Sequence, residues 1–281
     1  MPRTSPYPSD LSDAEWALLE PLLQSPPRGV VARRSGPRGA WRMPSSTCSG
    51  AAAPGGCSPD EYPPWQTLYY HFYYHFWKWR RDGRLRQAHD RLRAAVREAE
   101  GREPDPSGAV IDSQAVKGTG VGGPECGYDG AKRLSGRKRH LLGDTGGLVL
   151  GAHVHAANLH DRDGARRLLS DELKSELPRM ELLWADGAYT RGFREWAEEE
   201  WGWRVEVPQH PDRQLWRYGL EEKPRGFLVL PRRWVVERTF AWLGQARRLA
   251  KDYERLPETG VAMIHWAMSR IMLRRLIGAV H

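Results

Sequence analysis

Two short apolar runs, each followed by an aspartate, constrain the fold of this chain more than any other feature. Residues 109–111 (Ala-Val-Ile) precede Asp112, and residues 182–185 (Leu-Leu-Trp-Ala) precede Asp186. Short apolar runs rich in β-prone residues are typical of buried strands. An acid that follows such a strand is expected at the rim of a sheet, where a rigid element holds catalytic side chains in place.

Strands and helices alternate over the C-terminal part of the chain. Residues 136–155 predict a hairpin, with Asp-Thr-Gly-Gly at 144–147 as its turn. The patterns predict strands at 109–112, 138–144, 147–155, 181–186 and 203–207, and helices at 161–176, 190–201, 232–254 and 259–277. This order builds a mixed sheet flanked by helices, so we predict an α/β fold preceded by a small helical N-terminal region.

The N-terminal region contains two helical patterns. Residues 10–23 predict an amphipathic helix in which Ser12 is the N-cap and Glu15 completes a capping box. Residues 65–82 contain Tyr-Tyr-His-Phe twice in tandem, and the helix is expected to continue after Gly83 into residues 84–100. Four residues advance a helix by little more than one turn, so the duplication nearly keeps the buried face. The aromatic and basic side chains suit base stacking or DNA docking; a core helix with Lys and Arg on its wet side explains them equally.

Residues 24–60 have a different composition. They are rich in Pro, Gly, Ser, Ala and Arg, and no acid occurs between Glu20 and Asp60. This composition predicts a basic linker that is disordered or poorly packed. A solvated linker is favoured, and contact with DNA phosphates is the alternative. The predicted organisation is an N-terminal helix at 1–23, the linker at 24–62, an aromatic and basic DNA-binding region at 63–104 and a catalytic domain at 105–281.

The charge balance favours an acidic partner. The chain has 43 Lys and Arg against 35 acids, a formal net charge of +8, and nucleic acid is the commonest acidic partner. A basic protein without such a partner explains the charge as well. Three cysteines without CxxC spacing indicate neither a zinc site nor a disulfide framework, hence a reducing compartment. No membrane-spanning run or signal peptide is found, so we expect an intracellular protein without a membrane partner.

A third acid completes a possible metal site. Glu237 opens a helical pattern, so Asp112, Asp186 and Glu237 would come from a strand, a second strand and a facing helix. Mg²⁺ prefers a few carboxylate oxygens, and two such ions about 3.5–4 Å apart cleave phosphodiesters. Asp112 suits the bridging role, with Asp186 and Glu237 each holding one ion. For any single acid, a surface position or a cap is the commoner explanation, and an ion pair with Arg233 would account for Glu237.

The predicted helix around Glu237 has two useful faces. Val236, Phe240 and Leu243 form an apolar stripe that would anchor it on the sheet. Three basic residues, Arg247, Arg248 and Lys251, are expected further along the same helix, where they would meet DNA phosphates.

Several motifs in sequence order resemble the DDE transposases of the IS5 group, within the IS4-like superfamily. The resemblance covers about residues 108–275. It is carried by Ile-Asp-Ser-Gln-Ala-Val-Lys at 111–117, Gly-Arg-Lys-Arg-His at 136–140, Ala-Asn-Leu-His-Asp-Arg-Asp-Gly-Ala at 157–165, Ala-Asp-Gly-Ala-Tyr at 185–189, Arg-Arg-Trp-Val-Val-Glu-Arg-Thr-Phe-Ala-Trp-Leu at 232–243 and Arg-Arg-Leu-Ala-Lys-Asp-Tyr-Glu at 247–254.

The resemblance implies an RNase H-like core with Asp112, Asp186 and Glu237 as catalytic metal ligands for two Mg²⁺ ions, with Mn²⁺ as an alternative. It implies hydrolysis at the ends of an insertion element and attack of the freed 3′-hydroxyl on target DNA. The expected partners are double-stranded DNA, both terminal inverted repeats and target, and a second copy of the chain assembled on DNA in the bacterial cytoplasm, at the nucleoid. The DNA-binding candidates are Arg233, Arg238, Arg247, Arg248, Lys251, Lys138, Arg139 and Lys117.

The chain departs from the family pattern at two kinds of place. The superfamily's Tyr before Arg233 and its Lys after Glu237 are replaced by Leu230 and Gly244, so Arg247, Arg248 or Lys251 would stand in for the lysine. Residues 24–60 lack the family's helical apolar segment. A local shift of the reading frame, restored further along the gene, would produce such a stretch. Two alternatives therefore stay open: a catalytically silent DNA-binding remnant, and an RNase H-like metal-dependent nuclease without strand transfer.

Other candidates have simpler explanations. His140, His153, His155 and His160 cluster in sequence. Polar residues on one face of a strand are the commoner explanation of such a cluster, and a zinc site is the alternative. Asp161 and Asp163 open a predicted helix, where capping and the helix dipole account for them. Core packing explains the apolar stripe of residues 259–277, with a dimer surface as the alternative.

Overall fold

The computed structural model describes residues 11–24, 65–189, 192–207 and 234–278, and the chain divides into two compact units. The helical unit comprises residues 1–102, 246–250 and 262–281, and the sheet unit comprises residues 103–245 and 251–261. Arg233 and residues 25–64, which include nearly all of the predicted basic linker, lie outside the described residues.

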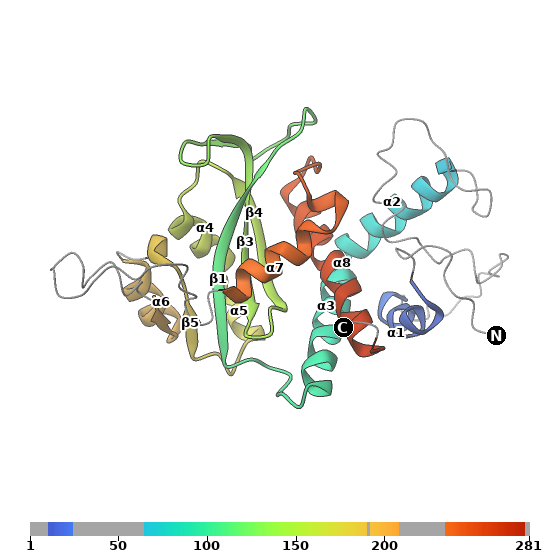
Figure 1. Cartoon of the computed structure of the whole chain (residues 1–281), viewed down its shortest axis with the longest axis horizontal. Coiled ribbons are helices and arrows are strands. Elements are labelled where there is room, and N and C mark those ends of the chain that lie inside the picture. Colours follow the sequence, from blue (N-terminus) through green and yellow to red (C-terminus); the bar gives the residue numbers. More distant parts are fainter. Residues whose placement is uncertain (1–10, 25–64, 190–191, 208–233, 279–281) are drawn as a thin grey trace, which may run out of the picture. The chain divides into compact units, whose positions relative to one another are not determined.

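The helical unit contains α1 (Asp13–Leu23), α2 (Trp65–Arg81), α3 (Arg84–Ala99) and most of α8 (Pro257–Leu276) (Figure 1). The predicted capping box at α1 is confirmed: Glu15 N donates to Ser12 Oγ at 3.2 Å, and Ser12 N donates to the Glu15 carboxylate at 2.5 Å. These bonds satisfy two backbone donors that the first turn of a helix leaves unpaired. The chain turns between α2 and α3 at Gly83, whose φ of 73° favours glycine.

The duplicated segment in α2 keeps one buried face, as predicted. Phe72 and Phe76, the last residues of the two repeats, are each 2% exposed, and their rings stack at 5.5 Å. Trp79 continues this face and stacks on Trp266 of α8. The opposite face leaves four large aromatic side chains exposed: Tyr69, Tyr70, Tyr74 and Trp77.

The described part of the sheet unit contains six strands: β1 (Gly108–Lys117), β2 (Gly127–Asp129), β3 (Leu134–Asp144), β4 (Val149–Ala156), β5 (Leu182–Trp184) and β6 (Arg204–Glu206). β3 lies between β1 on one side and β2 and β4 on the other, and all three pairings are antiparallel. β1, β5 and β6 pair in parallel. The predicted α/β fold with a mixed sheet is therefore confirmed, and its topology is consistent with an RNase H-like fold.

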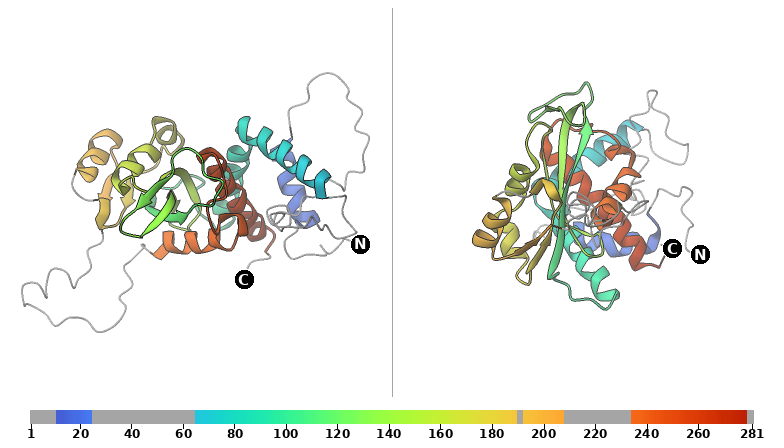
Figure 2. Two further views of the ribbon diagram at one scale, coloured as in Figure 1. Left: turned by 90° about the horizontal axis from the view of Figure 1, so that it is seen from above. Right: turned by 60° about the vertical axis from the view of Figure 1, so that its left-hand side comes forward.

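Helices cover both faces of this sheet. α4 (Asp161–Leu168), α5 (Asp171–Glu176) and α6 (Phe193–Trp201) lie on one face, and α7 (Trp234–Gly244) lies on the other (Figure 2). Ala109 and Ile111 of β1 enter the apolar core under α4, α5 and α6. Because successive strand residues point to opposite faces, Val110 and Asp112 belong to the face of α7.

The strand that carries Asp112 is longer than predicted. It continues to Lys117 because its pairing with β3 runs on through Lys117 opposite Gly136. Asp112 therefore lies in the middle of a strand and not after its end. The short strand β2 was not predicted from the sequence.

Two predicted helices are wrong in extent. The helix predicted at 161–176 is broken after Leu168, because Leu169 is extended and Ser170 caps the separate helix α5 by accepting from Leu173 N. The helix predicted at 232–254 ends at Gly244, and extended Ala246 separates it from the 3₁₀ turn Arg247–Leu249. Arg247, Arg248 and Lys251 thus do not share a helix with Glu237, contrary to the prediction.

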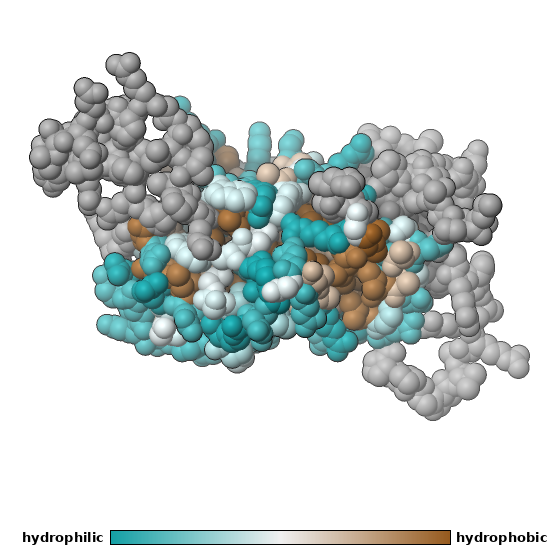
Figure 3. Space-filling model, turned by 60° about the horizontal axis from the view of Figure 1, so that its bottom comes forward, coloured by the Kyte–Doolittle hydropathy of each residue, from teal (hydrophilic) through white to brown (hydrophobic). Residues whose placement is uncertain are grey.

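On the face shown in Figure 3, hydrophilic side chains cover much of the surface and hydrophobic ones gather in separate patches. Among the described residues, none of the helices has the length and apolar character needed to cross a membrane.

Candidate active site

Asp112 and Asp186 are brought together by the register of two parallel strands. Val110 of β1 pairs with Trp184 of β5, and each aspartate follows its pairing residue by two positions. Residues at equal distances from a parallel pair lie at the same level of the sheet and point to the same face. Both aspartates accordingly line one pocket, whose walls are Val110, Ile111, Asp112, Trp184, Ala185, Asp186 and Val236.

Backbone amides orient both carboxylates. Ser113 N donates to Asp112 Oδ1 at 2.7 Å, and Ala188 N donates to Asp186 Oδ1 at 2.8 Å. Both aspartates are half-buried; the bond to Asp112 is partly buried, whereas the bond to Asp186 is exposed to solvent. The two acids thus have defined orientations at the rim where β5 ends.

Glu237 lies on the helix that closes the pocket. Its neighbour Val236 lines the pocket and is buried, whereas Glu237 itself is exposed. Val236 and Phe240 anchor α7, as the apolar stripe predicted. Across the described ranges, no three His, Cys, Asp or Glu side chains form a group able to hold a metal ion. The structure therefore pairs the two aspartates and places the helix of Glu237 beside them, without closing a three-carboxylate cluster.

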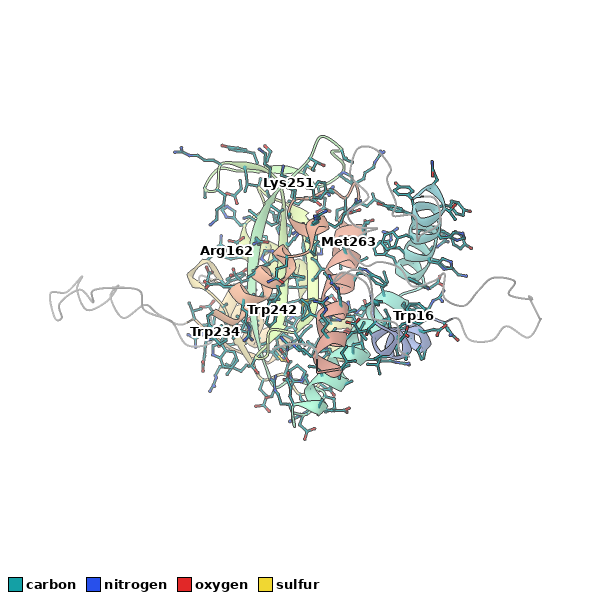
Figure 4. All side chains as sticks on the ribbon, turned by 45° about the vertical axis from the view of Figure 1, so that its right-hand side comes forward. Trp16, Arg162, Trp234, Trp242, Lys251 and Met263 are labelled. Carbon is teal, nitrogen blue, oxygen red and sulfur yellow. The ribbon has the colours of Figure 1, made fainter. Side chains whose placement is uncertain are left out.

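Arg238 fastens α7 to the turn between β3 and β4. Its guanidinium lies 4.4 Å from the ring centre of Trp234 and 4.6 Å from that of Trp242, the two α7 residues labelled in Figure 4. Its Nη2 donates to the carbonyl oxygen of Gly146 at 2.9 Å. Arg238, which the sequence predicts as a DNA ligand, thus also holds the helix that carries Glu237.

The same turn needs glycine where it meets α7. Gly147 has a φ of +81°, and a Cβ atom there would lie 2.9 Å from both Thr239 Oγ1 and the Trp242 ring. Thr239 Oγ1 donates to the Gly147 carbonyl at 2.8 Å. The Asp-Thr-Gly-Gly sequence thus provides both the hairpin turn and the close contact that fixes α7.

Arg238→Ala is expected to lower the free energy of unfolding by about 2 kcal/mol, because it removes two cation–π contacts and a hydrogen bond. Urea denaturation measures this change. Arg166→Ala is the matched control, since Arg166 also lies over a tryptophan, Trp196 at 5.3 Å, but is exposed. Equal effects of the two substitutions would contradict the anchoring role of Arg238.

Lys138 and Arg139 are also held inside the sheet unit. The Lys138 side chain is 11% exposed; its ammonium lies 3.0 Å from the Asp161 carboxylate and donates to the Leu159 carbonyl. Arg139 is 4% exposed and donates to the Lys251 carbonyl. Burial lowers the pKa of Arg139 to about 10, although Asp252 and Glu254 oppose the shift.

The remaining basic candidates differ in position. Lys117 and Lys251 are exposed, and a hydrogen bond from Asp252 N to the Lys117 carbonyl joins their two segments. Arg247 is exposed and Arg248 half-buried, and both belong to the helical unit. Lys117 and Lys251 therefore form a small basic surface of the sheet unit.

The histidine cluster is partly buried. His140 Nδ1 and His155 Nε2 are 2.7 Å apart, so these rings bond to each other. His153 stacks on His155, and exposed His160 precedes α4. Asp161, expected as a cap, accepts from Ser113 Oγ at 2.8 Å. Burial would raise the pKa of Asp161, but hydrogen bonds from Ser113 and Lys138 lower it overall.

Tyr189 was missed as a site residue. It is fully buried, and its hydroxyl contacts His140 Nε2 at 3.0 Å. Burial, and then the carboxylates of Asp112, Asp161 and Asp186, raise the pKa of Tyr189 well above its usual value. The available signal was its place three residues after Asp186, in a motif already noted.

Fold and site together define an RNase H-like α/β protein with an acidic pair at the rim of its parallel strands. A family model described as a transposase DDE domain matches residues 103–272, more than half of the 281 residues, and the protein belongs to this family. The match begins where the sheet unit begins. A search of curated proteins and a search of solved structures found no match.

Proposed function

We propose that the protein is the transposase of an insertion sequence, of the IS5 group, that cleaves DNA at the element's ends and joins the freed 3′-hydroxyl to target DNA. The observation that carries this proposal is the register that sets Asp112 and Asp186 side by side in one pocket. Membership of the transposase DDE domain family supports the same reaction class.

The donor set of the pocket fits Mg²⁺, and Mn²⁺ as its substitute. Carboxylate oxygens are the hard ligands that these ions prefer, and two aspartates line the pocket while Glu237 follows Val236 beside it. Asp112 would be shared by two ions, Asp186 would hold one and Glu237 the other. When bound, such ions activate the attacking oxygen and stabilise the leaving one. The amides of Ser113 and Ala188 hold the aspartates oriented for this task.

Basic and aromatic side chains supply the proposed DNA contacts. Lys117 and Lys251 would meet backbone phosphates near the site, with Arg233, Arg247 and Arg248 as further phosphate ligands. In the helical unit, α2 contains no acid, and it presents Tyr70, Tyr74 and Trp77 beside Lys78, Arg80 and Arg81. Exposed aromatic rings among cations suit both stacking on bases and contact with phosphates. We therefore assign binding of element ends to this surface.

The proposal is tested with a labelled element-end duplex and a supercoiled target plasmid. We expect strand cleavage and covalent joining to the plasmid with Mg²⁺ or Mn²⁺, and neither product when EDTA removes the metal. Cleavage without joined product would indicate the nuclease alternative. Cleavage that persists in EDTA would contradict the metal-dependent mechanism.

The departure of residues 24–60 from the family pattern favours one second candidate, a DNA-binding remnant without catalysis. Such a protein would bind element ends but yield no product with either metal. An active family member with an ordinary N-terminal region, assayed under the same conditions, is the positive control and should cleave. Light scattering of the DNA complex tests the proposed homodimer, since two copies per pair of ends are expected. A transposase of this kind would act at the bacterial nucleoid.

A further inference from the structure

Three buried side chains form a hydrogen-bonded chain close to the acidic pair. Tyr189, His140 and His155 are each 0% exposed. The Tyr189 hydroxyl lies 3.0 Å from His140 Nε2, and His140 Nδ1 lies 2.7 Å from His155 Nε2. His155 Nδ1 lies 2.9 Å from the carbonyl oxygen of Ala156. None of these side chains belongs to the proposed metal-binding triad.

The direction of every hydrogen bond follows from the last one. A carbonyl oxygen only accepts, so His155 Nδ1 carries a proton and donates to Ala156. Burial lowers the pKa of His155, and it lowers that of His140 to about 3, so both rings are neutral near pH 7. A neutral His155 accepts at Nε2, which makes His140 Nδ1 the donor and His140 Nε2 an acceptor. His140 Nε2 then accepts from the Tyr189 hydroxyl, whose oxygen is also within hydrogen-bond reach of the Ser113 side chain.

This direction commits the single proton of Tyr189. A phenol has one O–H donor, and that donor points to His140. The Tyr189 side chain is therefore held at its hydroxyl by His140, in the buried core of the sheet unit.

Tyr189 also holds the turn that orients Asp186. The 3₁₀ turn Gly187–Tyr189 follows the aspartate directly, and Tyr189 N donates to the Asp186 carbonyl at 3.1 Å. Ala188 N, in the same turn, donates to Asp186 Oδ1. The Tyr189 ring packs against Phe193 in the core. A fixed Tyr189 thus fixes the amide that aims the Asp186 carboxylate.

The histidine pair has no space in which to rearrange. α4 passes so close that a Cβ atom at Gly164 would overlap both His155 Nε2 and the His140 ring. Two neutral imidazoles held between a strand pair and a helix therefore keep one orientation.

We propose that Tyr189 and His140 are positioning residues for divalent-cation binding, because together they hold the turn that aims Asp186 at the cation shared with Asp112. The inference rests on the proposed function, because it assigns a role within that metal site. The proposed function names the metal ligands, and the inference adds which residues orient the Asp186 carboxylate.

The test measures Mn²⁺ affinity on the full chain by the paramagnetic resonance signal of free Mn²⁺. Tyr189→Phe removes only the hydroxyl, and we expect it to weaken Mn²⁺ binding about 10-fold, the lower end of the effect of residues that support metal ligands. His140→Leu is expected to act alike, whereas His140→Gln, which offers Tyr189 an acceptor, restores most of the affinity. Tyr128→Phe is the control, because Tyr128 is 58% exposed on β2.

The cleavage assay gives a second readout. Tyr189→Phe is expected to need more Mg²⁺ for half-maximal cleavage and to recover at saturating Mg²⁺. Denaturation curves without metal check that each variant is folded, because metal binding can itself rescue a destabilised protein. Equal Mn²⁺ affinities of the unaltered chain and Tyr189→Phe would overturn the positioning role while leaving the transposase proposal intact. An unaltered chain that binds Mn²⁺ no better than Asp186→Asn would overturn both. Mn²⁺ binding without cleavage would contradict the proposed function alone, and the affinities would still decide the role of Tyr189.

Discussion

Asp112→Asn is expected to reduce strand cleavage by at least about 10³-fold while DNA binding and folding are retained. A shared carboxylate ligand contributes several kcal/mol of transition-state stabilisation, and each 1.36 kcal/mol corresponds to about tenfold in rate. Asparagine has nearly the same shape and keeps the Oδ1 atom that accepts from Ser113 N. The substitution therefore removes the charge and one metal-binding oxygen, and little else.

Single-turnover cleavage of a labelled element end measures this loss, and a gel-shift assay measures binding. Asp171→Asn is the matched control, because Asp171 is exposed in the first turn of α5, away from the pocket. Asp186→Asn should behave like Asp112→Asn. If Asp112→Asn cleaves as fast as the unaltered protein, the acidic pair is not the catalytic site. If neither protein cleaves and both bind, the chain is the silent remnant.

Arg137→Met is expected to lower the free energy of unfolding by about 3–5 kcal/mol, the loss typical of breaking a buried ion pair. Arg137 is 1% exposed, and its Nη1 donates to Asp252 Oδ2 at 2.7 Å. The guanidinium also donates to the carbonyl oxygens of Pro124, Glu254 and Arg255. Methionine fills similar space but donates no hydrogen bond to these four acceptors. The charge of Asp252 would be left buried without its cation.

Urea denaturation of the sheet unit in the full chain measures this effect. Arg204→Met serves as the control, because Arg204 forms an exposed ion pair with Glu206 at 3.0 Å, and exposed pairs contribute less than about 1 kcal/mol. The double substitution Arg137→Met with Asp252→Leu should recover part of the lost stability, since it removes the stranded charge. A change below about 1 kcal/mol for Arg137→Met would show that the buried cluster is not important for stability.

The sequence predicted the sheet and the acidic pair because their signals are local. A run of three or four apolar residues defines each strand, and the aspartate follows in the same segment. The proximity of Asp112 and Asp186 then needs only a parallel pairing of the two strands, which the order of elements favours. The Ser12 capping box and the Asp-Thr-Gly-Gly turn were predicted for the same reason, since every partner lies within a few residues.

The roles of the basic residues were not predictable in this way. Lys138, Arg139 and Arg238 are indistinguishable in sequence from phosphate ligands, yet each is held by groups far along the chain. Asp161, the Lys251 carbonyl and the Gly146 carbonyl are the respective partners. Charge in a sequence shows which residues attract anions, but tertiary pairing decides which of them reach solvent. The helix that was predicted to carry both Glu237 and Lys251 in fact ends at Gly244, a residue type common at helix ends, and extended Ala246 follows it.

The mixed sheet has a consequence for the growing chain. β1, β3 and β4 are close in sequence and can pair before β5 has been synthesised, whereas the short parallel pairing of β1 with β5 needs a later segment. Parallel pairing between distant segments is a slow step of folding. During translation, Asp112 is therefore made before Asp186 is available to lie beside it, and Glu237 is made last of the three. A chain that ends before Glu237 would therefore lack one of the three proposed metal ligands, and we would not expect it to cleave DNA.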